Sequence, residues 1–163
     1  MKYTIEIGEY CFGRISRVND KDIIEYGYDD SKLNLDLVNF VFKQINLVKD
    51  KLDKSEIYTL VSILWSRSKN RSFDLTDEEY DNLDDEEDSI QIICDKLNND
   101  CSLILSELEL AKEELDSYDW YNLLEIIISN SNYILIEAKN DDCEQCGNYN
   151  FNEIYEIEIN EKD

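Results

Sequence analysis

The 163-residue chain contains no histidine and no proline, and it has only four glycines. Histidine is the side chain that most often acts as a general base or a metal ligand near neutral pH, so its absence argues against most acid–base enzymes. The scattered glycines form neither a Gly-x-Gly-x-x-Gly motif nor a phosphate-binding loop, and without histidine there is no Ser/His/Asp set. We therefore expect a protein that is not an enzyme and that needs no cofactor.

Long apolar runs are also missing. A membrane-spanning helix needs about 20 mainly apolar residues, and the chain has no such stretch. Its first seven residues alternate between polar and apolar and lack the apolar core of a signal peptide. The odd number of cysteines, five, fits a reducing compartment better than a secreted disulfide framework. These features predict a cytoplasmic protein with no membrane partner.

Basic residues are scarce relative to acidic ones. The chain has 16 Lys and Arg against 39 Asp and Glu, a net charge of −23. Hydrophobic residues make up 42% and aromatic residues 11%, which is enough to form a core and excludes a disordered acidic tail. So much negative charge repels nucleic-acid phosphates and anionic lipid, so we expect no direct nucleic-acid binding. Basic proteins, cations and neutral surfaces remain as partners.

The negative charge is concentrated after residue 73. Residues 1–73 carry a net charge of +1, residues 74–119 carry −16 and residues 120–163 carry −8. The densest stretch, residues 74–88, has ten carboxylates and no base. The short basic segment with Arg67, Lys69 and Arg71 precedes it, and we interpret these three residues as partners of the adjacent acids.

Alternating polar and apolar residues predict strands at both ends of the chain. Residues 3–7, 10–18 and 23–28 indicate two or three antiparallel strands, and residues 133–138 and 149–159 indicate a C-terminal β-hairpin. The region between them has helical periodicity. The sequence therefore predicts a single α+β domain over residues 1–163, with a near-neutral segment (residues 1–73) followed by a strongly acidic segment (residues 74–163).

Apolar residues at steps of three and four predict the central helices. The first two stripes are Leu37, Val41, Ile45, Val48 and Leu52, then Ile57, Leu60, Val61, Leu64 and Trp65. A capping-box pattern from Thr76 to Glu79 predicts a helix start. The last stripe is Trp120, Leu123, Leu124, Ile127 and Ile128, with Asp116 or Ser117 as the cap.

The acidic segment carries the longest stripe, which we call the seam. Its members are Ile90, Cys94, Leu97, Cys101, Ile104, Leu108, Ala111 and Leu115. This spacing predicts buried positions on one long acidic helix, with residues 98–100 as the point where it could break in two. The acids that lie off the seam are expected to face solvent: Asp95, Asp100, Glu107, Glu109, Glu113, Glu114 and Asp116. Next to them, Tyr118, Trp120 and Tyr121 with Asp116 and Asp119 form a candidate exposed aromatic–acidic patch.

Cys143 and Cys146 form the chain's single Cys-x-x-Cys pair. Free thiols, half of a zinc site and a disulfide or redox pair all fit such a pair, and the second half of a zinc site is missing. Cys11, Cys94 and Cys101 could complete a site only through the tertiary fold. We expect no bound zinc, with Cys143 and Cys146 as weak candidates. The acidic run also lacks the glycine and the spacing of a calcium-binding EF-hand loop.

In its size, extreme acidity and helical display of carboxylates, the chain resembles the DNA-mimic inhibitors that phages and mobile elements use against restriction and CRISPR nucleases. The resemblance implies an anti-CRISPR or anti-restriction protein that binds the basic nucleic-acid groove of a partner nuclease and, if phage-encoded, acts in the host cytoplasm. The partner-binding residues are then expected to be Asp74, Asp77, Glu78, Glu79, Asp81, Asp84, Asp85, Glu86, Glu87, Asp88, Glu107, Glu109, Glu113, Glu114, Asp116 and Asp119. Two alternatives stay open: an immunity protein or antitoxin against a basic nuclease toxin, and an acidic protein without mimicry.

Overall fold

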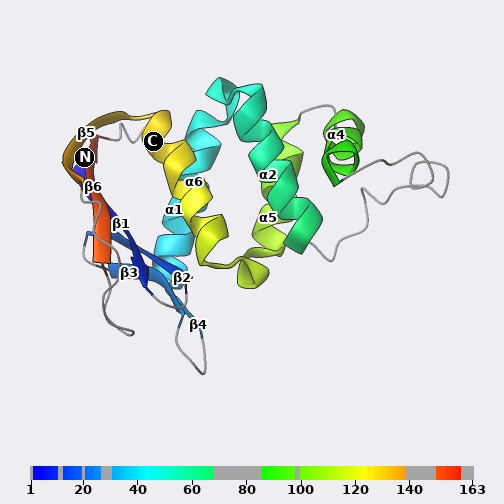
Figure 1. Ribbon diagram of the computed structural model, residues 1–163. Helices are drawn as coiled ribbons and strands as arrows, with labels where there is room; N and C mark the ends of the chain where they lie inside the picture. Colours follow the sequence, from blue (N-terminus) through cyan, green and yellow to red (C-terminus); the bar gives the residue numbers. More distant parts are fainter. Residues whose placement is uncertain are drawn as a thin grey trace. The chain divides into compact units, whose positions relative to one another are not determined.

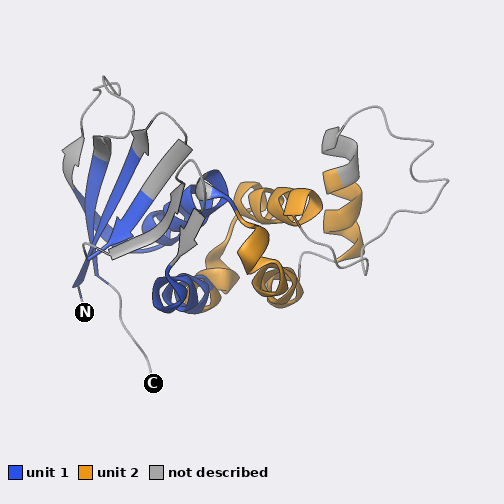
Figure 2. Ribbon diagram, turned by 90° about the horizontal axis from the view of Figure 1, so that it is seen from below, with its two compact units in different colours: residues 1–45, 116–163 blue, residues 46–115 orange. Residues whose placement is uncertain are grey.

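A computed structural model describes residues 2–10, 13–19, 21–26, 31–67, 86–97, 100–138 and 150–158 (Figure 1). Strands at both ends of the chain and helices between them confirm the α+β class. Contacts divide the chain into two compact units, residues 1–45 with 116–163 and residues 46–115 (Figure 2). The boundaries of these units do not coincide with the change in charge at residue 74.

Unit 1 contains a six-stranded sheet with the strand order β4-β3-β2-β1-β6-β5. Its strands are β1 (Lys2–Tyr10), β2 (Gly13–Val18), β3 (Lys21–Tyr26), β4 (Ser31–Leu33), β5 (Asn132–Ala138) and β6 (Asn150–Glu158). All neighbouring strands are antiparallel. The C-terminal hairpin is as predicted, and it joins the N-terminal strands through β6 and β1. The N-terminal region has four strands, whereas the sequence predicted two or three.

Helix α6 (Ser117–Ser129) packs on one face of the sheet against β2, β3 and β5. Residues 35–45 of α1 (Leu35–Val48) also contact the sheet, since the Phe40 ring lies 4.7 Å from the Tyr3 ring of β1. On that face, Ile5 lies opposite Val18 in β2 and opposite Tyr155 in β6. The apolar stripe predicted in α6 is confirmed, because all five of its members are buried. The rings of Phe42 in α1 and Trp120 in α6 are 5.9 Å apart in an edge-to-face arrangement, so the two helices share one core.

Local hydrogen bonds explain where α6 begins and ends. Asp116 is its N-cap, as predicted: the Asp116 carboxylate accepts from the Asp119 backbone N–H, and the Asp119 carboxylate accepts from that of Asp116. This reciprocal pair is a capping box. At the other end, the Asn130 side-chain amide donates to the Ile126 carbonyl, and the Ser131 hydroxyl donates to the Ile127 carbonyl.

The described secondary-structure elements of unit 2 are all helical. Its elements are η1 (Lys49–Lys51), α2 (Lys54–Arg67), α4 (Glu86–Lys96), α5 (Cys101–Leu110) and η2 (Lys112–Glu114). Helix α2 packs against both α4 and α5. Seven of the eight seam positions are buried, and Cys101 is half-buried, so the predicted seam forms the core of this unit. None of the described helices is both long and apolar enough to cross a membrane.

The seam does not lie on a single long helix. It is divided between α4 and α5, which confirms the predicted alternative of a break at residues 98–100. Asp100 is the cause on the α5 side. Its carboxylate accepts from the backbone N–H groups of Ser102 and Leu103 at 3.0 and 3.3 Å and so starts a new helix. The Asp100 N–H donates to the Leu97 carbonyl in the intervening turn. The capping box predicted at Thr76 lies outside the described residues.

Candidate binding surfaces

The structure describes a portion of the predicted acidic surface. Helix α4 begins at Glu86, so the backbone of Glu86, Glu87 and Asp88 forms its first turn. The other acids of the run lie outside the described residues: Asp74, Asp77, Glu78, Glu79, Asp81, Asp84 and Asp85. Of the basic segment, Arg67 is the last residue of α2, and Lys69 and Arg71 also lie outside.

Glu109, Glu113 and Glu114 are exposed, as predicted, where α5 ends and η2 follows. We call these three residues the α5–η2 acidic end. The last turn of α5 has no basic residue, although a helix C-terminus favours cations and disfavours carboxylates. Glu109 lies in this last turn, whereas Glu113 and Glu114 lie in the first turn of η2. Helix stability therefore does not account for the position of Glu109.

The prediction that Glu107 faces solvent is wrong. The residue is 6% exposed, and among the described residues its Oε2 atom has no hydrogen-bond partner. Because α5 is a new helix that begins at Cys101, its buried face includes Leu105 and Glu107 in addition to the seam residues Ile104 and Leu108. Glu107 is thus removed from the candidate binding surface.

The predicted aromatic–acidic patch at the start of α6 is also wrong. Trp120 is fully buried, and Asp119 is buried within the capping box that it forms with Asp116. Tyr121 is half-buried and donates to Glu125, so only Tyr118 remains exposed. Asp116 and Asp119 therefore have a structural role at the helix start.

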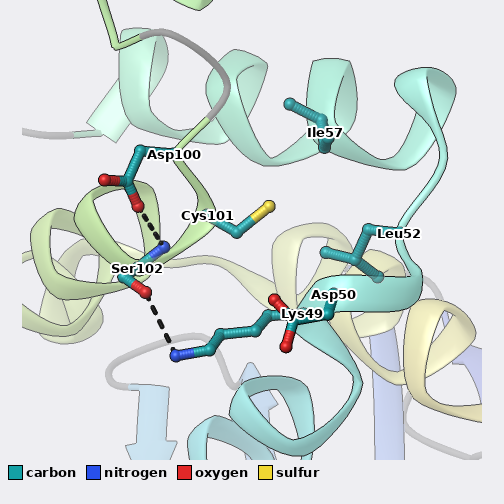
Figure 3. Close-up of a pocket in the computed structure, with 7 residues that line it drawn as sticks. All are labelled: Lys49, Asp50, Leu52, Ile57, Asp100, Cys101 and Ser102. Atoms are coloured by element: carbon teal, nitrogen blue, oxygen red, sulfur yellow. Dashed lines mark hydrogen bonds between the residues drawn. The ribbon is translucent and has the colours of Figure 1, made fainter.

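Unit 2 also contains a cavity of about 360 Å³ (Figure 3). It is lined by Lys49, Asp50, Leu52, Ile57, Asp100, Cys101 and Ser102. The Lys49 ammonium donates to the Ser102 hydroxyl at 3.1 Å (Figure 3). The Asp100 carboxylate already occupies the backbone N–H groups at the start of α5, so this helix end is closed to a further anion.

The electrostatics of this cavity do not support a nucleophilic cysteine. Burial raises the pKa of the Cys101 thiol, and the carboxylates of Asp100 and Asp50 raise it further, while Lys49 lowers it. Because the thiolate is the reactive form, a raised pKa makes Cys101 a poor nucleophile near neutral pH. The cavity therefore offers a polar surface but no activated group.

The other cysteines give no metal site that the structure can test. Cys94 is buried, and burial, followed by the charge of Asp95, raises the pKa of its thiol. Cys11, Cys143 and Cys146 lie outside the described residues. Within the described ranges, no group of three or more His, Cys, Asp and Glu side chains could hold a metal ion. The expectation of no bound zinc stays a prediction.

A second group of polar residues, which the sequence did not single out, lies in unit 1. We call Tyr121, Glu125, Tyr133, Glu153 and Tyr155 the tyrosine–carboxylate cluster. Tyr121 donates to Glu125 at 2.8 Å within α6, and Tyr155 donates to Glu153 within β6. The Tyr133 ring in β5 lies 5.8 Å from the Tyr155 ring, in an edge-to-face arrangement.

Charge links the two halves of this cluster. Burial raises the pKa of the Tyr155 phenol well above its usual value; Glu153 contributes next, and the nearby charges of Glu125 and Tyr121 add to the shift. The i, i+4 spacing of Tyr121 and Glu125 and the i, i+2 spacing of Glu153 and Tyr155 are visible in the sequence. Their proximity in space cannot be seen in the sequence, because it depends on the strand order that brings α6, β5 and β6 together.

No family model, curated protein or solved structure matches the chain. The function is therefore inferred from the charge and the geometry of the chain itself. Unit 1 holds 20 acidic and 8 basic residues and unit 2 holds 19 and 8, giving net charges of −12 and −11. Although the charge is distributed unevenly along the sequence, the two units thus carry almost the same net charge.

Proposed function

We propose that this protein is a non-enzymatic inhibitor that binds the basic nucleic-acid groove of a partner protein in place of the nucleic acid. The observation that carries the proposal is the α5–η2 acidic end, where three exposed carboxylates lie close together in the sequence and one of them, Glu109, stands at a helix C-terminus that disfavours negative charge. Because Glu109 does not stabilise the helix that carries it, binding explains its position better than folding does.

The charge balance of the chain supports this proposal. With 39 acids and 16 bases, acidic side chains outnumber basic ones by 23. B-DNA presents one negative charge per about 1.7 Å of its axis, and the proteins that bind it offer Lys and Arg for neutralisation. Carboxylates on a folded surface attract the same basic groove and steer association with it. An occupied groove stops a nuclease without any chemical step.

DNA competition tests the proposal. Immobilised protein captures proteins from a bacterial lysate at low salt, and double-stranded DNA is then used as the eluent. We expect release of nucleic-acid-binding proteins, because a mimic and DNA compete for one groove. Retention of every captured protein in excess DNA would contradict the proposal. Release of one secreted nuclease toxin alone would favour the immunity-protein alternative.

Two charge-matched variants make this test specific. The triple variant Glu109→Gln, Glu113→Gln, Glu114→Gln removes the α5–η2 acidic end. The control Asp36→Asn, Asp95→Asn, Glu158→Gln removes three exposed acids elsewhere. We expect the first variant to bind the released partner roughly tenfold more weakly, since each exposed charge contact contributes about 0.2–1 kcal/mol. Equal weakening of partner binding in the control would show that the effect depends only on net charge. It would then contradict the assignment of binding to the α5–η2 acidic end.

A further inference from the structure

Strand β5 is an edge strand with an unusual concentration of exposed apolar residues. In the strand order it comes last, and among the described strands only β6 pairs with it. Tyr133, Ile134 and Leu135 are 52%, 66% and 47% exposed. Because successive strand residues point to opposite faces, exposed apolar side chains lie on both faces of β5, although α6 contacts this strand on one of them. Unpaired backbone groups beside apolar side chains are the features to which another strand adds.

The two faces of this edge differ in chemistry. Tyr133 lies opposite Ile157 and Leu135 opposite Tyr155, so both share a face with Tyr155 and with Glu153 two residues before it. This is the face on which the tyrosine–carboxylate cluster gathers, with Tyr121 and Glu125 contributed by α6. Ile134 lies opposite Glu156 on the other face. A strand added beside β5 would therefore meet carboxylates and aromatic rings on one side and Ile134 on the other.

We propose that β5 is a docking edge for an extended, basic segment of a partner protein, which adds to the sheet as a further strand. Arginine or lysine at alternate positions of that segment would face the cluster. Glu125 and Glu153 would supply the opposite charge, and the rings of Tyr133 and Tyr155 would supply a surface for cation–π contacts. Apolar residues at the intervening positions would cover Ile134. This site is separate from the α5–η2 acidic end and does not depend on the function proposed for it.

Charge favours a basic partner over a second copy of this chain. Pairing β5 with β5 of another copy about a two-fold axis would place two tyrosine–carboxylate clusters on the same side of one continuous sheet. The carboxylates of both clusters, and two units that each carry a net charge of −12, would then repel one another. A segment with alternating positive charge removes this repulsion.

A synthetic peptide of alternating arginine and valine, blocked at both ends, is the probe. Its affinity for the full chain is measured by calorimetry, and the site is located by hydrogen exchange. We expect slower exchange of the backbone amides of β5 when the peptide is bound. A peptide of the same composition with arginines and valines in separate blocks should bind several-fold more weakly. A peptide N-methylated at alternate residues should lose binding, because strand addition needs its backbone N–H groups.

Variants of the protein assign the contacts. The double variant Glu125→Gln, Glu153→Gln should weaken peptide binding roughly five- to tenfold, as expected for the loss of two charge contacts, one exposed at Glu125 and one half-buried at Glu153. Tyr133→Ala should weaken it independently, and Glu109→Gln in unit 2 should leave it unchanged. Equal binding of the N-methylated peptide, or equal loss in the Glu109 variant, would overturn the proposal. So would sedimentation that shows a dimer whose formation protects β5 and excludes the peptide.

Discussion

Cys101 lies at the first position of α5, half-buried, with Asp50 and Lys49 acting on its thiol in opposite directions. Asp50→Asn removes a charge that raises the thiol pKa, so more thiolate forms at pH 8 and alkylation by iodoacetamide should be a few-fold faster. Lys49→Gln should slow it. Mass spectrometry of the alkylated peptides separates Cys101 from the other cysteines, and Cys94 is the internal control. Unchanged rates in both variants would contradict the charge arrangement of the cavity.

At the scale of single residues, the sequence predicted which apolar side chains are buried better than which acids are exposed. Burial of apolar side chains follows from helical spacing, whereas the exposure of an acid also depends on the width of a buried arc and on local hydrogen bonds. Glu107 is buried beside the seam, and Asp119 is held in the capping box. The spacing of the seam residues does not predict how wide the buried face of the helix is.

Helix α5 offers a matched pair of leucines for a stability prediction. Leu108 is fully buried, and Leu110 is 75% exposed on the same helix. Leu108→Ala should lower the free energy of unfolding by about 2–5 kcal/mol, since it leaves a cavity in the core of unit 2. Leu110→Ala should change it by no more than about 0.5 kcal/mol. Urea denaturation measures both, and equal effects would show that the seam does not form this core.

At the scale of elements, periodicity predicted the sheet, the stripe of α6 and the seam, but not the division into α4 and α5. The cause is that continuation of the helix competes with a new helix start, and the apolar spacing of the seam does not reveal this competition. The apolar spacing continues through residues 98–100, yet Asp100 stabilises a new helix start by accepting from Ser102 and Leu103. Likewise, residues 133–138 were recognised as a strand, but the position of β5 at the sheet edge depends on β6 pairing with β1.

At the scale of the whole molecule, the long-range fold redistributes the charge. Residues 1–45 pack with residues 116–163, so near-neutral and acidic segments form one unit, and the basic residues of η1 and α2 join the acidic run in the other. The division into a near-neutral and an acidic segment is therefore accurate for the sequence but does not hold for the two units. Both units carry enough negative charge to attract a basic partner.

The most direct test of the central claim is the association rate of the protein with its captured partner as a function of ionic strength. The rate should fall steeply with salt, because the steering charges are screened over a Debye length of about 8–10 Å. Replacing Asp84, Asp85, Glu86 and Glu87 with Ser should slow association more than it speeds dissociation and should flatten the salt dependence. An association rate that responds neither to salt nor to these substitutions would contradict binding through the acidic surface.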